Sequence, residues 1–348
     1  MGDLRSRIEV TKLARELGVA EGEISFLTAS APEDLRELRR LVSGALFARN
    51  EDRVKLLAAL SRMLPVPLTA KIAEVALGPA LSARVAGVLD PREASRLAGH
   101  LAPSFLAKLA VSLDPARVAP IVRGLPDDLV VDVGRRLLAA GEHVTLARFV
   151  AVVSPDVAMG VVEGSTGADL LQVALFTDEP AALDAIARRI GDEVLADVIR
   201  AASAAHAYDA AVTLLTSLSA ESCARLVGQV GVVEDNARES LVEAVAEHDV
   251  WPAILPALHT VDQDVLKALV NVPATLDSAI IDRVAMHSHR LDLAPVLVQL
   301  VLAMDDEHLD ALRESSVLRD PDLQEWLTAN AGVGTRLVLP VLESLGLR

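Results

Sequence analysis

The stretch from residue 67 to residue 126 decides the fold, and in rows of twelve it is PLTAKIAEVALG, PALSARVAGVLD, PREASRLAGHLA, PSFLAKLAVSLD and PARVAPIVRGLP. The first place of each row is a proline: Pro67, Pro79, Pro91, Pro103 and Pro115. The fourth, seventh, eighth and eleventh places are apolar, with Glu74 and Ser82 as the exceptions. This i, i+3, i+4, i+7 spacing is one face of an α-helix.

The prolines predict where each helix begins. Proline is tolerated at the first helical position, where its missing N–H would have no partner, and Asp90 and Asp114 precede two of them as good N-caps. Each row therefore predicts a helix of about nine or ten residues and a turn. Helices this short are marginal alone in water and need packing against neighbours. Such units, paired as hairpins of about 24 residues, predict a stacked α-solenoid or superhelix.

Beyond residue 126 the register loosens, but amphipathic segments of similar length continue. The spacing predicts helices at 128–140, 144–153, 155–163, 168–176, 180–190, 193–205, 208–218, 220–230, 236–247, 251–259, 265–270, 276–287, 293–304, 307–314, 321–329 and 336–345. No segment shows the sustained alternation of a half-buried strand. The fold class is predicted to be all-α.

The domain organisation follows from helix length and the lack of linkers. Residues 1–62 have longer, more charged helical segments and are expected to form an N-terminal cap. No Ser/Gly-rich tract divides the remainder, so 63–348 is expected to be one continuous helical repeat, strict over 67–126 and looser afterwards.

Composition excludes several classes of protein. The 348 residues are 52% hydrophobic, yet only eight are aromatic, and the mean hydropathy is +0.38. Charges or prolines interrupt every apolar stretch before about 18 residues, so no transmembrane helix is predicted. The start MGDLRSRIEV lacks the apolar core of a signal peptide, and the single Cys223 allows no internal disulfide. A cytoplasmic location is expected.

Charge is unevenly distributed along the chain. Residues 1–62 have 11 basic and 10 acidic side chains, residues 63–200 have 13 and 17, and residues 201–348 have 9 and 22. An acidic surface repels nucleic acid and favours a basic protein partner. The N-terminal basic residues alternate with acidic ones, which favours a salt-bridged surface and leaves a partner or phosphate site as the alternative. These residues are Arg36, Arg39, Arg40, Arg49, Arg53 and Lys55.

Motifs for chemistry are weak. His287 and His289 point to different helix faces, and the other histidines are scattered. The acidic group at Asp305, Asp306, Glu307 and Asp310 stands where a helix begins, which favours a helix terminus over a cation site. The segment 164–167 lacks the lysine of a phosphate-binding loop, and Cys223 lies in an apolar helical stretch. No catalytic residue, metal ligand or cofactor is assigned, and the protein is expected not to be an enzyme.

Two segments are apolar around most of the helix, at 251–261 and 293–304. Such a helix is buried in the core, in a partner interface or around an apolar ligand, and all three stay open here. The residues of this possible partner or ligand face are Trp251, Ile254, Leu255, Leu258, Leu297, Leu300 and Val301.

The repeat with its Leu-Asp-Pro steps at 89–91 and 113–115 resembles the cytoplasmic N-terminal superhelical domain of MgtE-type magnesium transporters. The resemblance is carried by residues 64–126, extends in repeat style over residues 64–231 and implies a short-helix α-solenoid; no magnesium ligand is transferred. Three functions are compatible with these observations. The first is a non-enzymatic scaffold or adaptor that binds a protein, the second binds a lipid-like ligand in a superhelical groove, and the third is a regulatory divalent-cation module. The sequence does not specify an oligomeric state.

Overall fold

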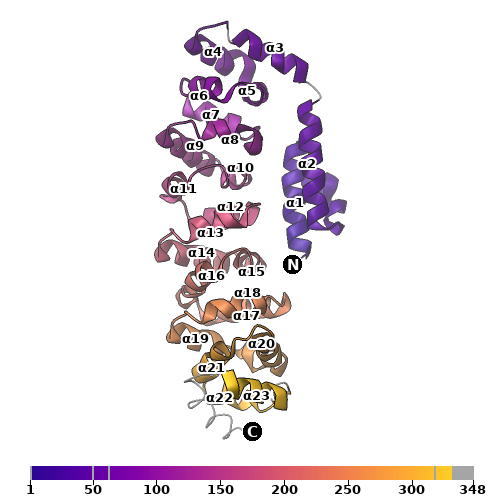
Figure 1. Ribbon diagram of the computed structural model, residues 1–348, viewed down its shortest axis with the longest axis vertical. Helices are drawn as coiled ribbons and strands as arrows, with labels where there is room; N and C mark the ends of the chain where they lie inside the picture. Colours follow the sequence, from indigo (N-terminus) through magenta and orange to yellow (C-terminus); the bar gives the residue numbers. More distant parts are fainter. Residues whose placement is uncertain (1, 49–50, 62, 317–318, 331–348) are drawn as a thin grey trace. The chain divides into compact units, whose positions relative to one another are not determined.

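The computed structural model describes residues 2–48, 51–61, 63–316 and 319–330, and these residues contain 23 α-helices and no strand. The expected all-α class is confirmed (Figure 1). Each helix expected between 128 and 329 is present, with ends within four residues of the prediction. The helix expected at 336–345 lies outside the described residues.

The chain forms two compact units, Met1–Arg189 and Ile190–Arg348. The α-helices of the first unit are α1 (Gly2–Leu17), α2 (Pro32–Ala48), α3 (Glu51–Ser61), α4 (Val66–Ile72), α5 (Gly78–Ala86), α6 (Pro91–Ala98), α7 (Pro103–Ala110), α8 (Pro115–Val122), α9 (Asp127–Ala139), α10 (His143–Phe149), α11 (Pro155–Val162), α12 (Gly167–Phe176) and α13 (Pro180–Ala187). A 3₁₀ segment, η1 (Glu21–Ala29), joins α1 to α2, and a π-helical segment, η2 (Ala73–Leu77), follows α4. The residues expected as an N-terminal cap thus share a unit with the strict repeat.

Most of these helices have a proline at their first or second residue, as the sequence predicts for the repeat. Pro91, Pro103 and Pro115 are the first residues of α6, α7 and α8, and the Asp90 and Asp114 carboxylates accept hydrogen bonds from backbone N–H groups of the first turns. In the first two rows the proline is the second helical residue, because α4 begins at Val66 and α5 at Gly78. Gly78 has a φ of +72°, so the chain turns there in a conformation that favours glycine.

The second unit continues with short helices. These are α14 (Asp192–Ala204), α15 (Tyr208–Leu215), α16 (Ala220–Val227), α17 (Asp235–Glu247), α18 (Trp251–Leu258), α19 (Gln263–Val270), α20 (Ser278–Arg290), α21 (Ala294–Ala303), α22 (Asp306–Leu312) and α23 (Pro321–Asn330). The 3₁₀ segments η3 (Val230–Val232) and η4 (Pro273–Leu276) follow α16 and α19.

The second unit has a repeat that the sequence analysis missed. Helices α14, α17, α20 and α23 begin at residues 192, 235, 278 and 321, each 43 residues after the previous one. The second helices begin at 208, 251 and 294, and the third helices at 220, 263 and 306, again 43 residues apart. The repeating unit here is therefore three helices long and not a pair of 12-residue helices.

A left-handed residue marks the same place in each repeat. His206, Asp249 and Asp292 have φ values of +49°, +47° and +56°, and they are the non-glycine residues with positive φ in the described chain. Each lies 14 residues after the start of the 13-residue helix that opens its repeat, which is α14, α17 or α20. These three helices are called the long helices below. The corresponding residue after α9 of the first unit is Gly141, with φ of +70°. This residue ends the long helix and turns the chain into the next one.

Packing follows a simple order within each unit. In the first unit α5 contacts α7, α7 contacts α9 and α9 contacts α11; in the second unit α14 contacts α16, α16 contacts α18 and α18 contacts α20. The buried residues are mainly Ala, Val, Leu and Ile, and Trp251 is the single aromatic among the buried residues of the described chain. Small side chains allow short helices to approach closely, which explains a hydrophobic composition that is poor in aromatics.

Candidate functional site

The seven residues expected to form a partner or ligand face lie in the core. None of Trp251, Ile254, Leu255, Leu258, Leu297, Leu300 and Val301 is more than 8% exposed. Leu297 and Val301 of α21 pack in one cluster with Ile281, Leu312 and Leu323. Core burial is thus the arrangement that the structure shows, and these side chains form no open surface. Within the described residues, no helix has the length and apolar character to cross a membrane.

The histidines make separate local contacts. His287 is buried and its Nε2 lies 3.0 Å from Asp249 Oδ1, whereas the His289 ring packs against Trp326. Within the described part of the chain, no three side chains of the metal-ligating types converge. The divalent-cation hypothesis therefore has no ligand set among these residues.

The other motifs have structural roles. Asp305 caps α22 by accepting a hydrogen bond from the His308 backbone N–H at 3.0 Å, a contact that lowers the pKa of Asp305, so the helix-terminus interpretation is confirmed. The segment 164–167 joins α11 to α12, where Thr166 and Asp169 form a capping box. Cys223 is fully buried, and burial raises the pKa of its thiol to about 12.

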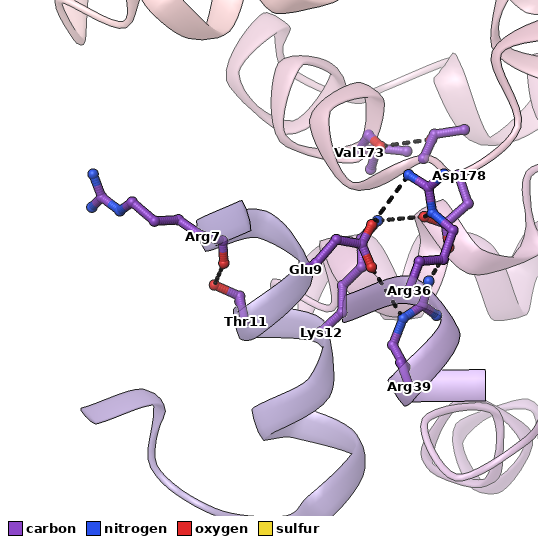
Figure 2. A network of polar contacts seen from close by, with 9 residues as sticks. Arg7, Glu9, Thr11, Lys12, Arg36, Arg39, Val173 and Asp178 are labelled. Carbon is purple, nitrogen blue, oxygen red and sulfur yellow. Dashed lines mark hydrogen bonds and ion pairs between the residues drawn. The ribbon is translucent and has the colours of Figure 1, made fainter. Parts of the chain in front are cut away.

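A buried network of charges joins the first two helices to the loop after α12. Lys12 Nζ lies 2.6 Å from Asp178 Oδ1 and 3.2 Å from Glu9 Oε1 (Figure 2). Arg39 of α2 donates to Asp178 Oδ2 at 2.8 Å and to Glu9 Oε2 at 3.3 Å. The Lys12 and Glu9 side chains are each only 3% exposed. Two carboxylates and two cations thus alternate around this network, and Arg36 lies at its edge.

The protonation state of Asp178 follows from its neighbours. Burial acts to raise the pKa of Asp178, but the charges of Lys12 and Arg39 and their hydrogen bonds outweigh burial, and the pKa lies below its ordinary value. Asp178 is therefore ionised at neutral pH. The ion pairs hold the α1–α2 hairpin against helices of the same unit that follow it by more than 100 residues.

A cavity of about 300 Å³ lies beside this network, between the hairpin and the helices α5, α8 and α10. Its basic wall residues are Lys12, Arg15, Arg39, Arg84, Arg117 and Arg148, and its acidic ones are Glu16 and Asp114. This balance is the reverse of that in the whole chain, which has 33 basic and 49 acidic residues. The cavity thus collects an excess of basic side chains from distant parts of the sequence.

The cations of this wall differ in their partners. Lys12 and Arg39 bind the buried carboxylates, Arg15 pairs with Glu142, and Arg117 pairs with Asp114 at 3.1 Å. In contrast, Arg148 has no hydrogen bond or ion pair with any described residue. Burial lowers the pKa of Arg148, attraction by Glu16 opposes this change, and repulsion by Arg39 adds to it.

Only part of this cavity could be predicted from the sequence. Arg39 is one of the N-terminal basic residues for which the sequence left a phosphate site as the alternative. Arg40, another of these residues, forms the expected exposed ion pair with Glu37. Arg49 lies outside the described residues. Arg84 and Arg148 stand in amphipathic helices where no local pattern distinguishes a cavity residue from a surface residue.

An acidic stripe follows one face of α17. Asp235, Glu239, Glu243 and Glu247 are spaced four residues apart, so they lie along one side of the helix. Arg238 pairs with Asp235. Among the described residues, no side chain or backbone group forms an ion pair or hydrogen bond with the carboxylates of Glu239, Glu243 and Glu247. Like charges at this spacing repel one another and destabilise a helix, so the stripe does not contribute to the stability of α17.

Comparison with known proteins adds no relative: no family model, curated protein or solved structure matches the chain. Function must therefore be argued from the geometry.

Proposed function

We propose that the protein is a non-enzymatic α-helical repeat scaffold, an α-solenoid that binds a basic segment of another protein. The acidic stripe of α17 carries this proposal, because three of its glutamates, which have no partner among the residues that the structure describes, form a row that a basic segment can neutralise. A 13-residue helix is about 20 Å long, enough for an extended basic segment of about six residues.

The repeat supports this assignment. Each helix contacts the helix that lies two places further along the chain, as α15 contacts α17 and α17 contacts α19. Such contacts are typical of stacked arrays. Such arrays expose one helix of each layer as a binding surface. The resemblance of residues 64–126 to the N-terminal domain of MgtE-type transporters stays a prediction about fold and contributes no magnesium site.

The two alternative functions have less support. A lipid-like ligand would need an apolar groove, whereas the apolar segments 251–261 and 293–304 pack in the core. A divalent cation would need converging carboxylates, which the described residues do not form. A cytoplasmic location remains an expectation from the sequence.

Substitution of the stripe tests the proposal. The triple variant E239Q/E243Q/E247Q should lose the proteins that the full chain retains from cell lysate at low salt. The matched control replaces Glu193, Glu221 and Glu325 with glutamine, which removes the same charge from three exposed positions on other helices of this unit. Quantitative mass spectrometry should show the retained basic proteins reduced with the stripe variant and unchanged with the control. Equal retention by both variants would reject α17 as the binding face.

A further inference from the structure

The cavity beside the buried charge network has the geometry of a binding site. Its walls come from α1, α2, α5, α8 and α10, so residues more than 130 positions apart converge on it. Its volume of about 300 Å³ is at the lower end of the range for small-molecule pockets. Val111, Leu113 and Val144 add an apolar part to the wall. The cavity can therefore accept a small ligand that has one strongly polar group and an apolar body.

The charges of the wall define the polar group. Lys12 and Arg39 are neutralised by Glu9 and Asp178, and Arg117 by Asp114. Arg84 and Arg148 remain, since neither forms an ion pair or hydrogen bond with a described residue. Glu16 attracts Arg148 through space only. Arg148 is partly buried and Arg84 is exposed, and the N–H donors of both guanidinium groups are available to an anion with several acceptor oxygens.

We propose that this cavity binds a phosphate group, carried by a small organic molecule or as free phosphate. A phosphate has a charge of about −1.5 to −2 at pH 7 and three acceptor oxygens, which matches two guanidinium forks better than a single carboxylate does. Ser43 and Ser112, which also line the cavity, can donate further hydrogen bonds. This site is independent of the acidic stripe on α17, because it lies wholly in the first unit.

Burial of the cations supports the same conclusion. Burial lowers the pKa of Arg15, and repulsion by Arg148 lowers it further. Burial is also the largest cause at Arg148, where it lowers the pKa; attraction by Glu16, Asp114 and Asp178 opposes it, and repulsion by Arg39 adds to it. Burial of these cations costs free energy in the protein without ligand, and a bound dianion offsets this cost. Ligand binding should therefore stabilise the fold as well as fill the cavity.

Calorimetric titration of the full chain with inorganic phosphate and with phenyl phosphate, at constant ionic strength with chloride, tests the proposal. Saturable heat is expected with at least one of the two. Tighter binding of phenyl phosphate would assign the site to an organic phosphate, and tighter binding of inorganic phosphate would assign it to the free ion. Absence of saturable heat with both probes, in a protein with the expected helical circular dichroism, would overturn the proposal.

Three variants locate the binding. Arg148→Gln should weaken phosphate binding by about tenfold or more, because it removes charge-assisted hydrogen bonds. Its thermal midpoint without phosphate should equal or exceed that of the wild type, a result that a purely structural role of Arg148 would not produce. Arg84→Gln, at an exposed position, should weaken binding severalfold. It keeps the test valid if Arg148→Gln fails to fold. Arg92→Gln, outside the cavity, should leave affinity unchanged within twofold. Wild-type affinity in R148Q and R84Q would overturn the proposal.

Discussion

Single residues decide how the N-terminal hairpin is held. Lys12 and Arg39 both contact Glu9 and Asp178, and their contacts to Asp178, at 2.6 Å and 2.8 Å, are the shorter ones. Asp178→Asn removes the nearer of two counter-charges of Lys12, whose side chain is only 3% exposed, and we expect it to lower the free energy of unfolding by about 3 kcal/mol. Urea unfolding followed by circular dichroism measures the change. Glu37→Gln, which breaks an exposed pair with Arg40, should have no measurable effect, and equal effects of the two variants would contradict the argument.

The same residue predicts a pH dependence. The folded-state pKa of Asp178 is lowered by Lys12 and Arg39, whereas in the unfolded chain it is near 3.9. The stabilisation is therefore complete above about pH 4 and is lost as the pH falls through the folded-state pKa. Unfolding measured from pH 7 to pH 3 should show the difference between wild type and Asp178→Asn shrinking below about pH 4. A difference that stays constant over this range would refute the assignment.

Cys223 offers a probe of the second unit at the residue scale. Its thiol is fully buried, with a pKa of about 12, so the reactive thiolate is scarce at pH 8. A disulfide reagent such as DTNB should react with one thiol in denaturant and with none on the minute timescale in the native protein. Rapid native labelling would show that α16 opens readily.

At the scale of helices and turns, the left-handed residue after each long helix is the most testable feature. His206 has φ of +49° and an exposed side chain, with a long 3.4 Å contact to Tyr208 as its hydrogen bond. Because glycine adopts this conformation without strain, His206→Gly should raise the free energy of unfolding by about 0.5–1 kcal/mol.

Asp292→Gly is the matched comparison. Asp292 has φ of +56°, but its carboxylate accepts the Trp326 Nε1–H bond at 2.9 Å. The relief of strain is therefore offset by a lost hydrogen bond of about 1 kcal/mol, and little net change is expected. Thermal unfolding of both variants separates the two contributions; an equal gain in both would show that the Trp326 contact contributes nothing.

At the scale of the whole molecule, the 43-residue period predicts modularity within the second unit. Deletion of residues 235–277 joins Glu234 to Ser278 and removes one complete set of three helices, α17 to α19. The shortened chain should keep its helical circular dichroism and unfold cooperatively with a smaller denaturant dependence, since less surface is buried. Deletion of residues 235–262 removes two of the three helices and should disrupt the unit. Equal folding of both deletions would mean that the 43-residue unit has no structural significance.

Sequence reasoning recovered the local structure well. The i, i+3, i+4, i+7 pattern and the proline and aspartate positions predicted the helices and several N-caps, because 3.6-residue periodicity and capping depend on neighbours within one turn. The same reasoning missed the 43-residue period, since the equivalent helices that begin at Asp192, Asp235 and Ser278 have dissimilar sequences.

The candidate sites divide in the same way. The acidic stripe on α17 follows from residue spacing on one helix and is visible in the sequence. The fate of Trp251 and Leu297 required the packed structure, because an apolar helix meets a partner or the core according to which helices surround it. The cavity also required the packed structure. Lys12, Arg84 and Arg148 come together only through long-range packing, and no local sequence pattern indicates that they are close in space. Helix positions are thus a local property of this chain, whereas burial and charge convergence are set by its tertiary contacts.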